Sequence, residues 1–74
     1  MADKITKAQL EELETAESLD HNEFHAMLAE YTGITAEPYT GYRYFDAAGN
    51  YVGNHTDGVN DLLESAYIEV VDNG

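Results

Sequence analysis

The stretch of sequence that decides the fold is Thr6–Ile34, TKAQLEELETAESLDHNEFHAMLAEYTGI, because it contains the start signals of two helices. Thr6 is followed three residues later by Gln9, and Asp20 is followed three residues later by Glu23. In a capping box of this spacing, the first side chain accepts a hydrogen bond from the backbone of the new helix, and the second reaches back to the first residue. The two pairs therefore predict two successive helices.

The apolar residues of this stretch follow the helical repeat. We expect the first helix at about residues 7–16 and the second at about residues 21–32, with Gly33 as a left-handed cap after the second. The apolar residues expected on the inner faces are Leu10 and Leu13, then Phe24, Met27, Leu28 and Tyr31. The apolar residues expected to pack in pairs across the two helix starts are Ile5 with Leu10 and Leu19 with Phe24.

After Ile34 the sequence changes to extended patterns. Pro38 forbids a continuing helix, and the segment after it is rich in aromatic residues that favour strands. Either Thr56 or Asp57 is a suitable N-cap for a third helix. The expected elements are a strand at Tyr39–Asp46, a turn at 47–50, a strand at Tyr51–Asn54, a short helix at about 59–66 and a last strand at Tyr67–Val71.

These elements predict one α+β domain over residues 1–74. We expect two N-terminal helices and then a β-hairpin–helix–strand unit, which forms a three-stranded sheet packed on one face by helices. The final strand is expected beside the first strand of the hairpin, through a right-handed crossover.

The composition is dominated by negative charge. The chain has 15 Asp and Glu against 3 Lys and Arg, a formal net charge of −12, whereas the solubility of a small domain needs a net charge of only about 2–8. This charge argues against nucleic acid and anionic membranes as direct ligands, because phosphates are bound by Lys and Arg. Since there is no Cys and no long apolar segment, we expect a cytoplasmic protein.

The acidic residues recur at helical spacing. Side chains three or four positions apart on a helix lie about 5–6 Å from each other, and successive phosphates of a nucleic-acid strand have a similar separation. Such rows could imitate the charge pattern of a strand for a basic protein, or could simply be the solvated faces of amphipathic helices. The candidate partner-binding carboxylates are Glu11, Glu14 and Glu17, then Asp20, Glu23 and Glu30, then Asp57, Asp61 and Glu64.

Tyrosines form the second cluster. Side chains alternate along a strand, so Tyr42 and Tyr44 should share one face, with Arg43 and Phe45 on the other. Tyr42 and Tyr44 either pack on the helices or form an interface, because tyrosines at interfaces give contact area at low entropic cost. We therefore expect either a monomer or a weak dimer. The whole cluster comprises Tyr39, Tyr42, Tyr44 and Tyr51.

The sequence indicates no catalytic, metal or cofactor site. His21 and His25 are four residues apart, as in zinc-binding pairs, and His55 is a further candidate ligand. The metalloprotease pattern needs Glu directly after the first His, and Asn22 occupies that position. We therefore expect a protein that is not an enzyme and needs no metal or cofactor.

With its small size, its carboxylate rows and its α+β order, and without cysteine, the chain resembles the small acidic proteins that phages and mobile elements direct against bacterial defence. Anti-CRISPR and anti-restriction proteins of the DNA-mimic type are the main examples. The resemblance implies an inhibitor whose partner is the basic surface of a Cas effector complex or a restriction enzyme. The alternative is a structural or regulatory interaction domain that assembles through its Tyr-rich sheet.

Overall fold

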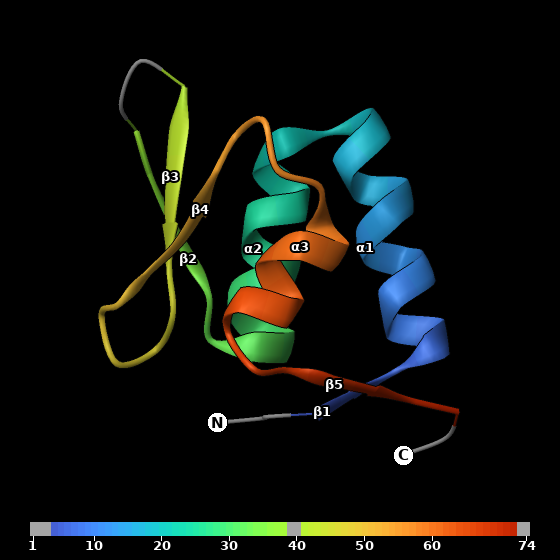
Figure 1. The fold of residues 1–74 in the computed structure, drawn as a ribbon. Helices are drawn as coiled ribbons and strands as arrows, with labels where there is room; N and C mark the ends of the chain where they lie inside the picture. Colours follow the sequence, from blue (N-terminus) through green and yellow to red (C-terminus); the bar gives the residue numbers. More distant parts are fainter. Residues whose placement is uncertain (1–3, 39–40, 73–74) are drawn as a thin grey trace.

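A computed structural model describes residues 4–38 and 41–72 of the chain (Figure 1). Tyr39, part of the expected tyrosine cluster, lies outside these residues. Within the described part, no helix is long and apolar enough to cross a membrane. The elements in chain order are β1 (Lys4–Thr6), α1 (Lys7–Leu19), α2 (His21–Thr32), β2 (Thr35–Pro38), β3 (Tyr42–Phe45), β4 (Tyr51–Asn54), α3 (Val59–Ser65) and β5 (Glu69–Val71).

The two predicted helix starts are confirmed. Thr6 Oγ1 accepts a hydrogen bond from the Gln9 backbone N–H at 3.1 Å, and Gln9 Oε1 accepts one from the Thr6 backbone at 2.9 Å. Asp20 Oδ1 accepts hydrogen bonds from the backbone of Asn22 and Glu23, at 2.9 and 3.4 Å. The helix α1 runs three residues further than expected and ends at the N-cap of α2. Gly33 ends α2 in the left-handed conformation, with φ 79°.

The α+β class is also confirmed. Strands β2, β3 and β4 form an antiparallel sheet, and the helices lie on one side of it (Figure 1). The β3–β4 hairpin is closed by Asp46, whose carboxylate accepts hydrogen bonds from the backbone of Ala48 and Asn50, at 3.0 and 2.8 Å. These hydrogen bonds hold the pKa of Asp46 below its ordinary value, the one from Asn50 contributing most.

The composition of the sheet differs from the prediction. Its third strand is β2, which pairs with β3, and the C-terminal strand β5 instead pairs in parallel with β1. Sequence reasoning missed β2 because Pro38 has no N–H for a ladder, although such a residue is tolerated at the edge of a sheet. The three-residue β1 is too short for an alternating pattern. Both missed strands are defined by long-range pairing.

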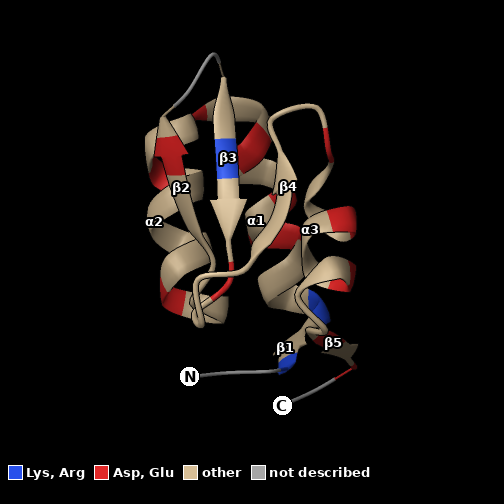
Figure 2. Ribbon diagram, turned by 60° about the vertical axis from the view of Figure 1, so that its left-hand side comes forward, with Lys and Arg blue, Asp and Glu red and all other residues tan. Residues whose placement is uncertain are grey.

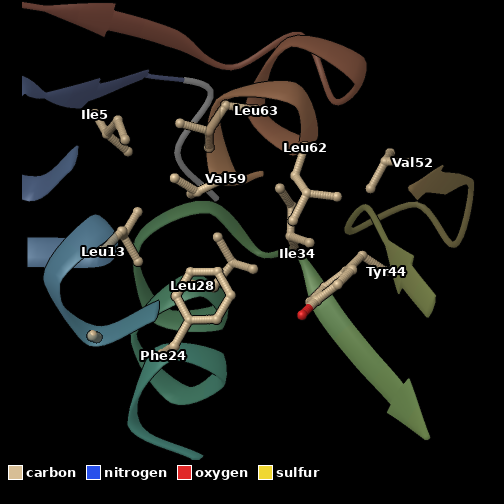
Figure 3. Packing of buried hydrophobic residues seen from close by; sticks show 11 residues of the cluster. Ile5, Leu13, Phe24, Leu28, Ile34, Tyr44, Val52, Val59, Leu62 and Leu63 are labelled. Atoms are coloured by element: carbon tan, nitrogen blue, oxygen red, sulfur yellow. The ribbon is translucent and has the colours of Figure 1, made fainter. Parts of the chain in front are cut away.

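One hydrophobic core joins the helices to the inner face of the sheet (Figure 3). Phe24 and Leu28 of α2 and Leu13 of α1 are at most 2% exposed, as is Ile34 after the left-handed cap. The buried hydrophobic residues are Ile5, Leu13, Ala16, Phe24, Leu28, Ile34, Tyr44, Val52, Val59, Leu62 and Leu63. The core therefore fixes all three helices relative to the β3–β4 hairpin.

Two local predictions about packing and capping are wrong. Leu19, expected to pack against Phe24, is 81% exposed at the end of α1. The N-cap of α3 is Gly58, without a side-chain hydrogen bond, rather than Thr56 or Asp57. Asp57 accepts a hydrogen bond from the Asn54 backbone at 2.9 Å instead. The Asp57 carboxylate therefore holds the turn before the helix and leaves the helix start without a local cap.

Candidate functional site

Eight of the 15 acidic residues lie on the three helices. In Figure 2, red segments occur on all three helices and on β2, while β3 carries a blue band. That band is Arg43, the single basic residue after Lys7 in the sequence. Lys7 itself pairs with Asp72, with 2.8 Å between Lys7 Nζ and Asp72 Oδ1. The helical side is therefore a surface of negative charge with little internal compensation.

The predicted row on α1 does not stay on one face. Six residues of a helix turn by about 600°, so Glu17 lies roughly 120° around the axis from Glu11. Glu11 lines a groove between α1 and α2, together with Glu12 and Glu23. Glu14 instead lies beside α3, where the Asn60 side-chain amide donates a hydrogen bond to Glu14 Oε2 at 3.4 Å.

Six of the exposed carboxylates on the helices consequently form two groups. The groove group consists of Glu11, Glu12 and Glu23, which line the space between α1 and α2. The α3 group consists of Glu14 with Asp61 and Glu64, the exposed acidic residues of α3. Of the other predicted carboxylates, Glu30 is exposed on α2.

Glu17 has a structural role that the sequence did not indicate. It is partly buried, and its carboxylate accepts a hydrogen bond from the backbone of Val59, the first residue of α3. This contact supplies from α1 the cap that Gly58 lacks. Burial raises the pKa of Glu17, with a further increase from the nearby Glu14 and opposing effects from His21 and Val59. Glu17 thus belongs to the contact between α1 and α3 rather than to the open surface.

Two further candidate carboxylates are occupied by local structure. Asp20 is the N-cap of α2, and Asp57 binds the Asn54 backbone. Both carry charge near the surface, but their oxygens already accept hydrogen bonds that shape the chain. Sequence reasoning recognised this role for Asp20 and proposed a different capping role for Asp57.

Tyr42 and Tyr44 share the inner face of the sheet, as their alternation predicts. Tyr44 is 5% exposed, which removes its side chain from the surface that a partner could contact. Its hydroxyl lies 2.9 Å from His25 Nε2. The half-buried Tyr42 packs edge-on against His25, with 4.5 Å between ring centroids. The predicted tyrosine face is therefore mainly a contact between β3 and α2.

Burial also changes the protonation of this contact. Desolvation lowers the pKa of His25, and the neighbouring His21 lowers it further. Desolvation raises the pKa of the Tyr44 hydroxyl, with smaller contributions from Glu17 and Tyr42. The neutral forms of His25 and Tyr44 are thus favoured where α2 packs on the sheet.

The outer face of the sheet carries Arg43 and Phe45, which are not among the predicted partner-binding residues. Arg43 and Phe45 alternate with the buried Tyr44 and so point away from the core. The ring of Phe45 packs edge-on against Tyr51 on β4, with 5.9 Å between centroids, and Tyr51 is 55% exposed. Glu37 of β2 lies directly opposite Arg43, so this face carries one carboxylate beside its one basic residue. The face is aromatic and has far less net charge than the helical side.

The three histidines are the candidate metal ligands of the sequence. In the described part of the chain, no group of three or more His, Asp, Glu or Cys residues has a geometry that could hold a metal ion. His21 and His25 lie with ring centroids 6.1 Å apart. His55 packs over Gly41, where a β-carbon would collide with its ring.

Comparison of the chain with protein-family models, with curated proteins and with solved structures finds no match. The function therefore has to be inferred from the surface of this molecule.

Proposed function

We propose that this protein is a cytoplasmic inhibitory binding protein whose acidic helical side occupies the nucleic-acid-binding surface of a basic protein complex. A Cas effector complex or a restriction enzyme is the class of partner proposed. One observation carries the proposal: exposed carboxylates occur on all three helices, and the single basic residue after Lys7 lies on β3. The protein acts by binding, without catalysis.

Rigid carboxylates are suited to this task. The three helices are fixed by one core, so the backbone positions that carry the acidic side chains are fixed relative to one another. A positively charged DNA channel attracts such a surface over long distances and binds it in competition with DNA. Because charges held by packed helices need little reordering, association loses less conformational entropy than it would for an acidic disordered tail.

The uneven distribution of charge supports binding over solubility as the reason for the net charge of −12. Solubility requires only that charge be present on the surface, whether on helices or on strands. Here the outer face of the sheet has aromatic residues and Arg43 opposite Glu37, whereas eight of the 15 carboxylates lie on the helices. Self-repulsion among them destabilises the fold, so a use for the gathered charge is expected.

A second candidate function is assembly through the outer face of the sheet. The Phe45–Tyr51 pair favours it, since aromatic side chains are enriched at protein interfaces. A sheet-mediated assembly should be insensitive to salt, whereas binding by the carboxylates should weaken steeply as salt increases.

The test is a competition assay with labelled target DNA. A purified Cas effector complex and a purified restriction enzyme are each incubated with DNA and increasing amounts of this protein, at 50 to 200 mM salt. We expect DNA to be displaced from at least one of them at 50 mM salt, and the affinity of this protein for that complex, measured without DNA, to fall at least about tenfold over this range. An inability to displace DNA from either at 50 mM salt contradicts the proposal.

Sedimentation of the protein alone distinguishes the second candidate. Self-association that persists at 500 mM salt and is lost in Tyr51→Ser would support assembly through the sheet. A monomer at all salt concentrations would exclude self-assembly through this face.

A further inference from the structure

The groove between α1 and α2 combines apolar and acidic residues. It has a volume of about 570 Å³ and lies on the side of α1 away from α3, because Glu14 faces α3 and is not part of its lining. The apolar lining consists of Ala8, Ala16, Leu19 and Met27, and the polar lining of Glu11, Glu12, Thr15 and Glu23. Such a volume has room for a few side chains rather than for a whole helix.

Leu19 is the most informative residue of the groove. It is a large apolar side chain at 81% exposure, although burying a leucine stabilises a protein by about 1.5–3 kcal/mol. Its position before the N-cap of α2 favours packing against Phe24, and yet it lines the groove instead. Leu19 therefore offers apolar surface near the α1–α2 junction, and the half-buried Met27 offers it further along α2.

The opposite end of the groove is bordered by a hydrogen bond between the helices. The Tyr31 hydroxyl donates to Glu12 Oε2 at 3.2 Å, which ties α2 to α1 across the groove. The carboxylates of Glu11 and Glu23 also line the groove. The apolar lining is thus accompanied by negative charge, and no Lys or Arg is among the lining residues.

This combination defines the chemistry of an occupant. Helices of 12 and 13 residues extend about 18–20 Å, so the groove offers a straight track about three turns long. We infer that the groove binds a basic amphipathic helix of a partner protein, with its apolar residues on Leu19 and Met27 and its Lys or Arg side chains against Glu11, Glu12 and Glu23. An apolar stripe bordered by cations matches this lining in both respects.

The inference rests on the proposed function for the basic character of the partner, but adds an apolar anchor that DNA mimicry does not require. If the protein only imitated the charge of DNA, its affinity for the partner should depend on the number of carboxylates alone. An apolar anchor makes part of the affinity resistant to salt, because hydrophobic contacts are not screened.

The probes are two synthetic 18-residue peptides of equal charge. One has Lys with Leu at positions i, i+3, i+4 and i+7, and the other has Gln in place of every Leu. Binding is measured by fluorescence anisotropy at 150 mM salt, and the contacted residues are located by amide chemical shifts. We expect the Leu peptide to bind at least tenfold more tightly than the Gln peptide and to shift groove residues.

Two matched variants test the location. Leu19→Ser removes the exposed apolar side chain and should weaken binding of the Leu peptide at least tenfold, whereas Tyr51→Ser removes an exposed aromatic residue from the sheet and should leave it unchanged. Melting curves verify that both variants fold.

Equal affinity for the two peptides, unchanged binding by Leu19→Ser, or shifts confined to the sheet would overturn the inference. So would self-association of the protein that Leu19→Ser abolishes, because the occupant would then be a second copy. Failure of the groove with successful DNA competition would leave the proposed function intact. Peptide binding in the groove without displacement of DNA would support the groove and contradict DNA mimicry.

Discussion

The helical side and the outer face of the sheet differ in how their residues are used. On the helical side, exposed carboxylates form the groove group and the α3 group. Their electrostatic repulsion destabilises the fold. On the outer face of the sheet, Arg43 lies among aromatic residues, with Phe45 packed on Tyr51. The difference shows that the net charge of −12 is distributed unevenly over a single small core.

Within the helical side, the same chemical group has two kinds of role. Glu17 and Asp20 accept backbone hydrogen bonds that organise the ends of helices. Glu11 lies at the groove, where its role in folding is small and its role in binding is proposed.

Substitutions on the two faces of β3 should differ most in their effect on the free energy of unfolding. Tyr44→Ala removes a ring that is 5% exposed and its contact with His25, and should lower the free energy of unfolding by about 3–5 kcal/mol. Phe45→Ala removes a half-buried ring from the outer face and should lower it by less than about 1.5 kcal/mol. Urea denaturation measures both. Equal losses would mean that the outer face is part of the core.

Substitutions of the α1 carboxylates should also differ in their effect on the free energy of unfolding, but by a smaller amount. Glu17→Ala removes the cap on Val59 and should lower the free energy of unfolding by about 1 kcal/mol. Glu17→Gln keeps an acceptor and removes a carboxylate whose pKa is raised, so stability should be retained. Glu11→Ala, a control on the groove, should change stability by less than about 0.5 kcal/mol. A stable Glu17→Ala would contradict the capping role.

Acidification should weaken the contact between α2 and β3 through His25. Its folded pKa lies below the ordinary value of 6.5, so the unfolded state binds more protons and His25 favours folding at higher pH. Its contribution should be lost as pH falls through about 6.5 towards the lower folded pKa. Wild type should therefore lose stability relative to His25→Gln between pH 7.5 and 5.

The pH comparison includes the other groups around His25, which are His21 on α2, Glu17 on α1, and Tyr42 and Tyr44 on β3. Glu17 has the opposite sign, because a raised pKa favours the folded state as pH falls. Measuring wild type minus His25→Gln isolates one group.

The smallest effect should be that of salt on the fold itself. Raising salt from 10 to 150 mM shortens the screening length from about 30 to about 8 Å. Repulsion among the carboxylates should weaken, and the melting temperature should rise by a few degrees, equivalent to about 1 kcal/mol. A melting temperature that falls over this range would contradict net repulsion on the helical side.

Local signals allowed much of the fold to be predicted from the sequence. The capping residues Thr6 and Asp20 located both long helices, and Gly33 marked the end of the second. The hairpin followed from aromatic residues on either side of a polar turn. Strands β1 and β2 were missed because their pairing partners, at Glu69–Val71 and Tyr42–Phe45, lie elsewhere in the sequence.

The candidate site could be predicted only in part. Spacing indicated which carboxylates are exposed, but it could not show that Glu17 reaches the start of α3, because that contact depends on how two helices pack. Alternation placed Tyr42 and Tyr44 on one face without deciding that this face is buried. The exposure of Leu19 contradicts local rules, and only the arrangement of α1 and α2 makes it visible as part of a groove.

The central claim is that the exposed carboxylates of the helical side are a binding surface. The most direct measurement repeats the DNA competition assay with a variant in which Glu11, Glu12, Glu14, Glu23 and Glu64 become Gln and Asp61 becomes Asn. Each change keeps the shape of the side chain and removes one charge, so the variant should fold. We predict that displacement of DNA is lost in this variant and retained in the sheet variant Tyr51→Ser; undiminished displacement by the neutralised variant would contradict the account.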